Sequence, residues 1–427
     1  MKTLESIAAE LQGYDPQAIT AEGVNQFLSR LVEPVTDVEP VSVFEALGRV
    51  LSQDLVSPIS VPPHDNSAMD GFAFGSDNLV AGEPVQLKVV GTAFAGKAWV
   101  GELAAGECLK IMTGAIMPAG ADTVIPLEFV KVDGDRINVP AGVVSAGDNR
   151  RLLGEDLMAG SPALHRGQVL GPAALGLIAS LGLAAVPVFR RVRVAYFSTG
   201  DEILSLGEQP REGAVYDSNR YTVFGLLSRL GVEVIDMGVV GDEPAKLEAA
   251  FLEAAERADA IITSGGVSMG EADHTKAMMK KLGDVAFWRI AMRPGRPMAV
   301  GRIEGSGGSA GAILFGLPGN PVAVMVTFLA FVRPALLRLM GASATEPVLL
   351  QARSLEPLRK KPGRTEYQRG VVSRDAAGTL QVRTTGNQGS GVLSSMVQAN
   401  GLIVLRHEQS NVAVGDLVEV MVFDGCI

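Results

Sequence analysis

Three apolar runs between residues 192 and 315 each end in a turn of small, polar, glycine or proline residues. The runs, with the turns that follow them, are residues 192–196 with 198–202, residues 260–262 with 263–268, and residues 311–315 with 317–321. In a parallel sheet the carboxyl ends of the strands share one edge, and open α/β folds bind their ligands there. The sequence therefore predicts an open α/β sheet whose binding edge is formed by these turns.

The segments between these runs have the pattern of helices that cover a parallel sheet. After Asp217-Ser218-Asn219, apolar residues recur at helical spacing until Gly231, and a second helical pattern follows Gly241-Asp242-Glu243-Pro244. A strand is predicted between them at residues 232–239. The order strand, helix, strand, helix, strand favours right-handed crossovers and a mostly parallel sheet with helices on both faces.

The turn Thr263-Ser264-Gly265-Gly266-Val267-Ser268 is a candidate phosphate cradle. Two adjacent glycines allow several backbone N–H groups to converge on an anion. Taken alone, the motif is equally compatible with an ordinary strand-to-helix turn, because short glycine motifs are not specific. The other two turns favour the binding interpretation, since they place further polar residues at the same edge.

A second candidate anion site is the segment 288–297, which contains Arg289, Arg293 and Arg296 and is interrupted by prolines. Proline excludes a regular helix here. A solvated loop is the alternative interpretation. Because the segment lies between two predicted strands of the sheet, and guanidinium groups suit bidentate capture of phosphate or of an oxyanion such as molybdate, we expect it to bind an anion.

The chain of 427 residues is long enough for two to four domains, and the changes in helix and strand pattern along it predict four. A capping box at Ser42 and Glu45 predicts a helix over residues 42–53, a second helix is predicted between Pro172 and Gly182, and short strands with turn residues lie between the two helices. The predicted domains are a discontinuous helical N-terminal domain (21–58 and 152–188), an inserted small β domain (59–151), an α/β domain (189–340) and a C-terminal β-barrel domain (341–427).

Composition argues against several kinds of partner. A formal net charge of −10 disfavours nucleic acid, whose phosphates need a basic surface. Cys108, Cys426 and the four scattered histidines give neither a disulfide framework nor zinc-ligand spacing. No signal peptide is visible, and no apolar run approaches the length of a membrane span. A cytoplasmic protein with no nucleic-acid or membrane partner is expected.

Six motifs then follow one another in a recognisable order: Asn66-Ser67-Ala68-Met69-Asp70-Gly71, Ile111-Met112-Thr113-Gly114-Ala115, Ser198-Thr199-Gly200-Asp201-Glu202, Ser264-Gly265-Gly266-Val267-Ser268, Gly270-Glu271-Ala272-Asp273 and Leu317-Pro318-Gly319-Asn320-Pro321. Over residues 25–422 the chain resembles the molybdopterin molybdenumtransferase family, which includes the bacterial MoeA proteins and the E domain of gephyrin. The resemblance implies that molybdate is inserted into the dithiolene of adenylylated molybdopterin, with release of AMP and with Mg²⁺ assisting. It also implies an elongated homodimer with active sites shared between subunits, and transient contact with other molybdenum cofactor biosynthesis proteins.

The resemblance also assigns roles to individual residues. The catalytic positions would be Thr113 and four acids that would bind the metal, Asp70, Glu202, Asp242 and Asp273, because hard carboxylate oxygens suit Mg²⁺. Residues 264–268 would bind a phosphate or the pterin end, and residues 318–321 would shape the pterin pocket. The substrate-binding positions would be Arg151, Thr199, Ser264, Gly265, Gly266, Val267, Ser268, Arg293, Arg296, Pro318, Gly319, Asn320, Pro321 and Ser390.

One departure from the family concerns Arg293 and Arg296, where lysine is common. An arginine keeps a role in oxyanion or phosphate binding but excludes any role that needs a neutral amine. Two other functions stay open. A molybdopterin adenylyltransferase of the related fold is disfavoured by the extra β domains and the 66–71 motif, and it would release pyrophosphate rather than AMP. A gephyrin-like scaffold without catalysis is disfavoured by the four acidic positions.

Overall fold

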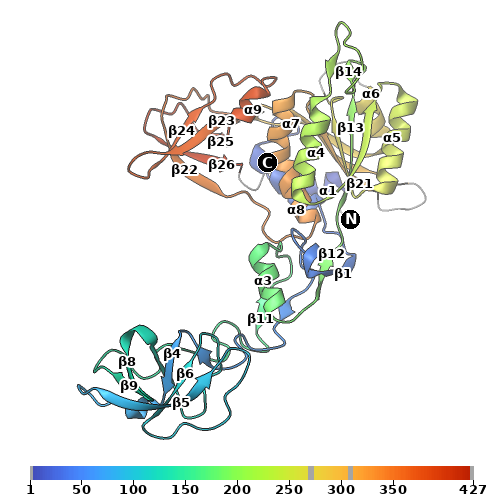
Figure 1. Ribbon diagram of the computed structural model, residues 1–427. Coiled ribbons are helices and arrows are strands. Elements are labelled where there is room, and N and C mark those ends of the chain that lie inside the picture. The colour runs from blue at the N-terminus through green and yellow to red at the C-terminus, as the bar shows by residue number, and fades with distance from the viewer. Residues whose placement is uncertain (1–2, 268–273, 306–310, 424–427) are drawn as a thin grey trace.

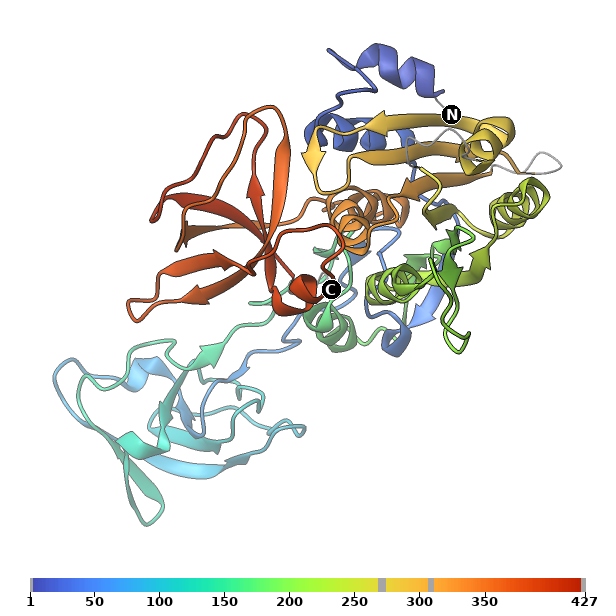
Figure 2. The ribbon, with the colours of Figure 1, turned by 90° about the horizontal axis from the view of Figure 1, so that it is seen from above.

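The computed structural model describes residues 3–267, 274–305 and 311–423. The chain forms an elongated body in which an α/β part and a C-terminal barrel lie next to each other, and a narrow arm leads away from them to a separate β lobe (Figure 1). The view from above shows the same separation of the β lobe from the α/β part (Figure 2). The multidomain α/β plus β architecture predicted from the sequence is confirmed.

The α/β part is built on a six-stranded sheet in the order β16-β13-β17-β21-β20-β18. Strands β16, β13, β17 and β21 are parallel, whereas β20 and β18 extend one edge as antiparallel strands. The carboxyl ends of β13, β17 and β21 therefore meet at one edge, as predicted. The strand bounds are β13 Arg193–Thr199, β16 Glu233–Val240, β17 Ala260–Ser264, β18 Gly283–Arg289, β20 Pro297–Ile303 and β21 Ala312–Leu317.

Helices cover both faces of this sheet because successive side chains of β13 point to opposite sides. Val194 and Tyr196 lie in one buried core with residues of α4 and α7, whereas Ala195 and Phe197 lie in a second core with residues of α5 and α6. The helix periodicity read from the sequence is confirmed for α4 and α5. The helix bounds are α4 Ser218–Leu230, α5 Pro244–Arg257, α6 His274–Leu282 and α7 Pro321–Thr327.

The helix α7 continues through the π-helical turn η5 (Phe328–Val332) into α8 (Arg333–Leu339). Within the described part of the chain, this stretch is the one helix that is long and apolar enough to cross a membrane by length and composition, which the sequence analysis did not anticipate. Its most apolar window is 83% buried inside the protein, as in a core helix. The N-terminal helices α1 (Leu4–Glu10) and α2 (Ala21–Leu31) pack on the same side, where Phe27 contacts Trp288 edge to face.

The arm contains two short antiparallel strand pairs and one helix. Strand β1 (Val38–Ser42) pairs with β12 (Ala185–Phe189), β2 (Leu55–Val56) pairs with β11 (Pro162–Leu164), and α3 spans Pro172–Ser180. The helix predicted between Pro172 and Gly182 is therefore confirmed.

The helix predicted over residues 42–53 is wrong. The capping box of Ser42 and Glu45 is present, but it begins only a single 3₁₀ turn, η1 (Val43–Glu45). Gly48 takes a left-handed backbone with φ of +72°, which ends any helical path. Val50 and Leu51, two apolar residues within the predicted helix, instead form β-bridges to Val169 and Val188 on the far side of the insertion. Long-range pairing therefore overrides a local helix signal here.

The β lobe and the barrel account for the remaining strands. The lobe is a six-stranded sheet in the order β7-β4-β6-β5-β9-β8, and the barrel closes because β23 pairs with both β24 and β25. In the lobe the bounds are β4 Gly71–Phe74, β5 Val85–Ala93, β6 Glu107–Ile111, β7 Thr123–Pro126, β8 Lys131–Asp133 and β9 Arg136–Val139. In the barrel they are β22 Leu349–Ser354, β23 Thr365–Arg374, β24 Leu380–Thr384, β25 Gly401–Leu405 and β26 Leu417–Val422.

Candidate active site

A cavity of about 1030 Å³ lies where the carboxyl edge of the sheet meets the C-terminal barrel. Its walls come from the turns after β13, β17 and β21, from the arginine segment between β18 and β20, and from a loop of the barrel. The predicted site residues that line it are Thr199, Glu202, Asp242, Gly265, Gly266, Val267, Arg293, Arg296, Pro318, Gly319, Asn320 and Ser390. The three turns thus form one site, together with a barrel loop that is distant in sequence.

The turn after β17 requires its glycines. Gly265 and Gly266 have φ of +93° and +63°. A Cβ on Gly265 would lie 2.5 Å from the Thr199 carbonyl oxygen, and one on Gly266 would lie 2.5 Å from the Cβ of Thr275. The Gly265 N–H already donates to the Leu317 carbonyl at 3.2 Å. An anion bound at this turn would therefore have to use the N–H groups that follow Gly265, and Ser268 lies outside the described residues.

Ser264 does not line the cavity, in contrast to the residues that follow it. Its hydroxyl lies in a buried cluster at 2.7 Å from the Tyr196 hydroxyl and 3.2 Å from the Ser198 hydroxyl, and Tyr196 and Ser198 are 2.8 Å apart. Burial raises the pKa of the Tyr196 phenol, so this cluster is neutral. It ties the carboxyl ends of β13 and β17 together beneath the cavity.

Two of the four predicted acids share the cavity. Glu202 and Asp242 both line it, and the main-chain N–H of Asp242 donates to the Asp201 carboxylate at 3.1 Å. Asp273 lies outside the described residues. Over residues 3–267, 274–305 and 311–423, no group of three or more histidine, cysteine or acidic side chains has the arrangement of a metal site. A divalent cation would need oxygen ligands beyond these two carboxylates.

The arginine segment gives the cavity its positive charge. Arg293 and Arg296 are exposed at its wall, and β19 (Met292–Arg293) pairs with β23, which joins this segment to the barrel. Arg364 also lines the cavity and forms an ion pair with the buried Glu366 at 2.7 Å. Arg364 was not among the predicted site residues, although the basic run at residues 359–364 is visible in the sequence.

The barrel loop that carries Ser390 is held from beneath by Arg369, which is fully buried. The Arg369 guanidinium donates to the carbonyls of Asn387, Gln388 and Gly389 at 3.1, 3.2 and 2.9 Å. Burial and the nearby charge of Arg293 lower the pKa of Arg369 to about 10. The sequence offered no signal for this support, because it comes from the interior of a strand.

The turn at residues 318–321 is positioned by a helix that is about a hundred residues away in sequence. The Asn219 amide, at the start of α4, donates to the Gly319 carbonyl at 2.7 Å. Asn219 is buried, and Gly319 and Asn320 line the cavity. Pro321 is the first residue of α7 and does not line the cavity, since its role there is to begin the helix. From the sequence, Asn219 was predicted only as part of a helix start.

Asp70, Thr113 and Arg151 lie on the β lobe and do not line the cavity of the same chain. The Asp70 carboxylate accepts hydrogen bonds from the N–H and the hydroxyl of Thr113, and all three residues are exposed. Arg151 in β10 (Arg150–Arg151) pairs with Asn66 in β3 (Asn66–Ser67), at the start of the motif that contains Asp70. Within one chain, the described residues that line the cavity and the lobe residues Asp70, Thr113 and Arg151 therefore form two separate groups.

The fold and this cavity define an α/β protein with an arginine-lined cavity at the carboxyl edge of its sheet, joined to two β domains. Comparison with known proteins gives the family. The MoeA N-terminal region (domain I and II) matches residues 19–182, the probable molybdopterin binding domain matches residues 195–338, and the MoeA C-terminal region (domain IV) matches residues 351–423. The chain belongs to the molybdopterin molybdenumtransferase (MoeA) family, as the sequence resemblance indicated.

Relatives support this over nearly the whole chain. A molybdopterin molybdenumtransferase of Haemophilus influenzae is 40% identical over 405 residues, covering 94% of this chain and 98% of the relative. Molybdopterin molybdenumtransferase 2 of Mycobacterium tuberculosis is 35% identical and covers 92% of this chain and 96% of its own. A crystal structure of the MoeA protein of Pyrococcus horikoshii superposes with a TM-score of 0.79 at 27% identity, covering 95% of this chain and 100% of that chain.

Proposed function

We propose that this protein inserts molybdate into adenylylated molybdopterin and releases AMP, and thereby acts as a transferase in molybdenum cofactor biosynthesis. One observation carries the proposal. The cavity of a chain that belongs to the MoeA family joins two exposed arginines, a glycine turn and two carboxylates at one edge of the sheet. This combination suits a substrate with two anionic parts, an oxyanion and a phosphoanhydride.

The residues of the cavity would divide the substrates between them. Arg293 and Arg296 would bind molybdate with their guanidinium forks. The N–H groups after Gly265 would face a phosphate, and the turn with Gly319 and Asn320 would contact the pterin end. Holding both reactants in one cavity would convert an encounter between two molecules into a reaction within one complex.

The carboxylates of the cavity fit a Mg²⁺ ion that is bound jointly by the protein and the substrate. Mg²⁺ is commonly bound through one or two carboxylates together with substrate phosphates, so Glu202 and Asp242 would suffice once the substrate is bound. Bound there, Mg²⁺ would supply neutralisation of the phosphate charge. The chain's own contribution is to orient Asp242, whose N–H is held by the Asp201 carboxylate.

The site would be completed by a second copy of the chain. Asp70 and Thr113 are exposed on the β lobe, away from the cavity of their own chain. In a closed twofold dimer the same complementary contact occurs twice, so each cavity would receive the Asp70–Thr113 pair of the partner. The proposal thus includes a homodimer with two composite sites.

The cytoplasm is the compartment that we propose, with transient contacts to the enzymes that supply adenylylated molybdopterin. The thiol of Cys108 is free and buried, as suits a reducing compartment. The two alternatives are not favoured, because the relatives that match nearly the whole chain are named as molybdenumtransferases.

The test is to incubate the purified protein with adenylylated molybdopterin, Mg²⁺ and molybdate, and to measure AMP and pyrophosphate separately. Molybdate-dependent AMP release supports the proposal. Pyrophosphate release from molybdopterin and ATP would support the adenylyltransferase instead. If a preparation shown to be folded releases neither product, a scaffold without catalysis would be the remaining interpretation.

A further inference from the structure

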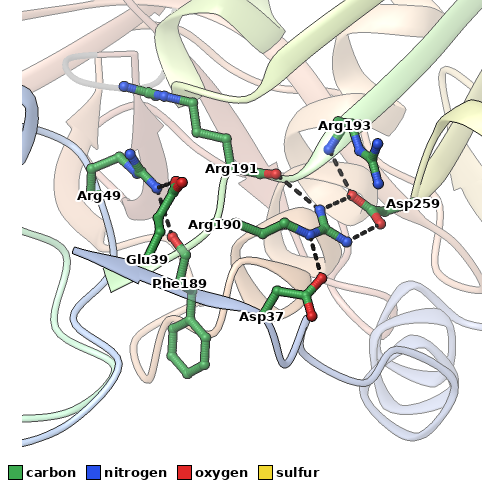
Figure 3. Close-up of polar contacts among 8 residues, drawn as sticks. All are labelled: Asp37, Glu39, Arg49, Phe189, Arg190, Arg191, Arg193 and Asp259. Carbon is green, nitrogen blue, oxygen red and sulfur yellow. Dashed lines mark hydrogen bonds and ion pairs between the residues drawn. The ribbon is translucent and has the colours of Figure 1, made fainter. Parts of the chain in front are cut away.

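The joint between the arm and the α/β part is crossed by two chain segments, one before β1 and one between β12 and β13. Asp37 lies in the first segment and Arg190 in the second. Asp259, the third participant, immediately precedes β17 in the α/β sheet. Figure 3 shows the Arg190 side chain between these two carboxylates.

Arg190 bridges both segments and the sheet with one guanidinium group. Its two terminal nitrogens donate to the two carboxylate oxygens of Asp259 at 2.7 Å each, and its Nε donates to Asp37 at 2.8 Å. The main-chain N–H of Arg190 also donates to the Asp37 carbonyl at 2.9 Å. A planar fork with donors on two sides can make this arrangement, whereas a lysine cannot.

Asp259 is itself fixed to the sheet. One of its carboxylate oxygens also accepts the main-chain N–H of Arg193 at 2.8 Å, and its side chain is only 15% exposed. Burial opposes ionisation of Asp259, but Arg190 and the Arg193 N–H outweigh burial and lower its pKa below the ordinary value. The ionised carboxylate is therefore a rigid anchor for Arg190.

A second set of contacts makes the adjoining end of the arm rigid. The guanidinium of Arg49, 6% exposed, donates to Glu39 at 2.5 Å and to the Phe189 carbonyl at 2.9 Å (Figure 3). Glu39 belongs to β1 and Phe189 to β12, so Arg49 joins the two strands that leave the joint. Arg190 links this end of the arm to the sheet, alongside the Arg191 guanidinium, which donates to the Gly231 carbonyl at the end of α4.

We propose that Arg190 is a positioning residue that fixes the angle between the arm and the α/β part, and through it the place of Asp70 and Thr113 relative to the cavities. The inference rests on the proposed dimer with shared sites, because only there does the arm angle determine whether the two groups of site residues meet. A small rotation at the joint moves the distant β lobe by many times more than it moves the joint itself.

The test compares Arg190→Gln with Arg220→Gln. Arg220 makes a similar forked pair, to Asp236 at 2.8 and 2.7 Å, and has similar exposure, 24% against 23% for Arg190, but it lies wholly within the α/β part. Spin labels at Lys131→Cys on the β lobe and Ala249→Cys on α5, in labelled chain diluted with unlabelled chain, report the arm angle. Isothermal titration with AMP and with molybdate measures whether the cavity keeps its affinity for each ligand.

For Arg190→Gln we expect a broader distance distribution and at least about tenfold slower molybdate-dependent AMP release, while AMP and molybdate affinities stay within about twofold. Arg220→Gln should match the wild type in the distance distribution, in the rate of AMP release and in the affinities for AMP and molybdate. Asp37→Asn, which keeps the Asp259 pair, should broaden the distribution to an intermediate extent and serves if Arg190→Gln does not fold. An unchanged distribution in both joint variants would overturn the proposal, as would slow turnover without broadening. If the wild type releases no AMP, the proposed function fails. The spin-label distances still test whether Arg190 fixes the angle of the arm.

Discussion

The Asp70 carboxylate accepts two hydrogen bonds from one residue, Thr113, from the main-chain N–H at 2.7 Å and from the hydroxyl at 2.8 Å. Both bonds stabilise the ionised form, the N–H more strongly, and they lower the pKa of Asp70 below its ordinary value. Although exposed, Asp70 is therefore held in one orientation on the surface of the β lobe. Such order in an exposed carboxylate is what a contact to a partner molecule would require.

Thr113→Val should raise the pKa of Asp70 partway towards its ordinary value, because the variant loses the hydroxyl donor and keeps the N–H. A lowered pKa in the folded state stabilises the fold above the unfolded-state pKa, and this contribution disappears as the pH falls through the folded-state pKa. A carboxyl-carbon NMR titration of Asp70 measures the midpoint directly. The hydroxyl is irrelevant if the midpoint is the same in Thr113→Val and the wild type.

Asp242→Asn should slow AMP release by at least about tenfold, or about 1.4 kcal/mol of transition-state stabilisation, with the fold intact. The amide keeps the shape of the side chain but removes a charge from the cavity wall. Glu243→Gln is the matched control, since Glu243 is adjacent, pairs with Lys246 on the surface and does not line the cavity. We predict the same loss for Asp273→Asn. Wild-type turnover in both aspartate variants would rule out a catalytic role for these acids.

Arg293→Ala combined with Arg296→Ala should raise the half-saturating molybdate concentration by about tenfold or more, because each guanidinium removed takes charge-assisted donors from the oxyanion. Stability should change little, since both side chains are exposed and the turn is closed by a main-chain bond from Ile290 to the carbonyl of residue 296 at 2.7 Å. Removing Lys280 and Lys281 on α6 makes the same change in net charge as a control. An equal shift in both double variants would mean that only overall charge matters.

Asn219→Leu should weaken substrate binding, because the turn at Gly319 loses its hydrogen bond from α4. One such bond is worth about 0.5–1.5 kcal/mol, so we expect the apparent KM for adenylylated molybdopterin to rise by roughly two- to tenfold. Gly231→Ala, at the left-handed end of the same helix, should lower stability without changing the KM. If the KM rises in both variants in proportion to their loss of stability, Asn219 affects the KM only by stabilising α4.

The parts of the fold that the sequence predicted correctly are those with strong local signals. The helices α4 and α5 were predicted because apolar residues recur at helical spacing between capping and stop residues, and β17 because a buried strand ends at a glycine pair. The cavity-lining turns followed from one rule, that parallel strands end at a common edge.

The parts that the sequence did not predict depend on contacts between distant segments. Val50 and Leu51 lie in the segment predicted as a helix, yet they pair with segments beyond the insertion. Asn219 reaches Gly319 and Arg369 supports the loop of Ser390, and neither contact leaves a periodic pattern in the chain. The same holds for the separation of Asp70 from the cavity, which is a matter of domain placement.

The central claim is that the Asp70–Thr113 pair of one subunit completes the cavity of the other. The most direct test is AMP release by heterodimers formed from Asp70→Ala chains and Asp242→Ala chains, each inactive as a homodimer. Each heterodimer would contain one cavity with both acids intact and one with neither, so we predict recovery to about half of wild-type activity per dimer. Verified heterodimers that remain as inactive as their parents would contradict the shared site.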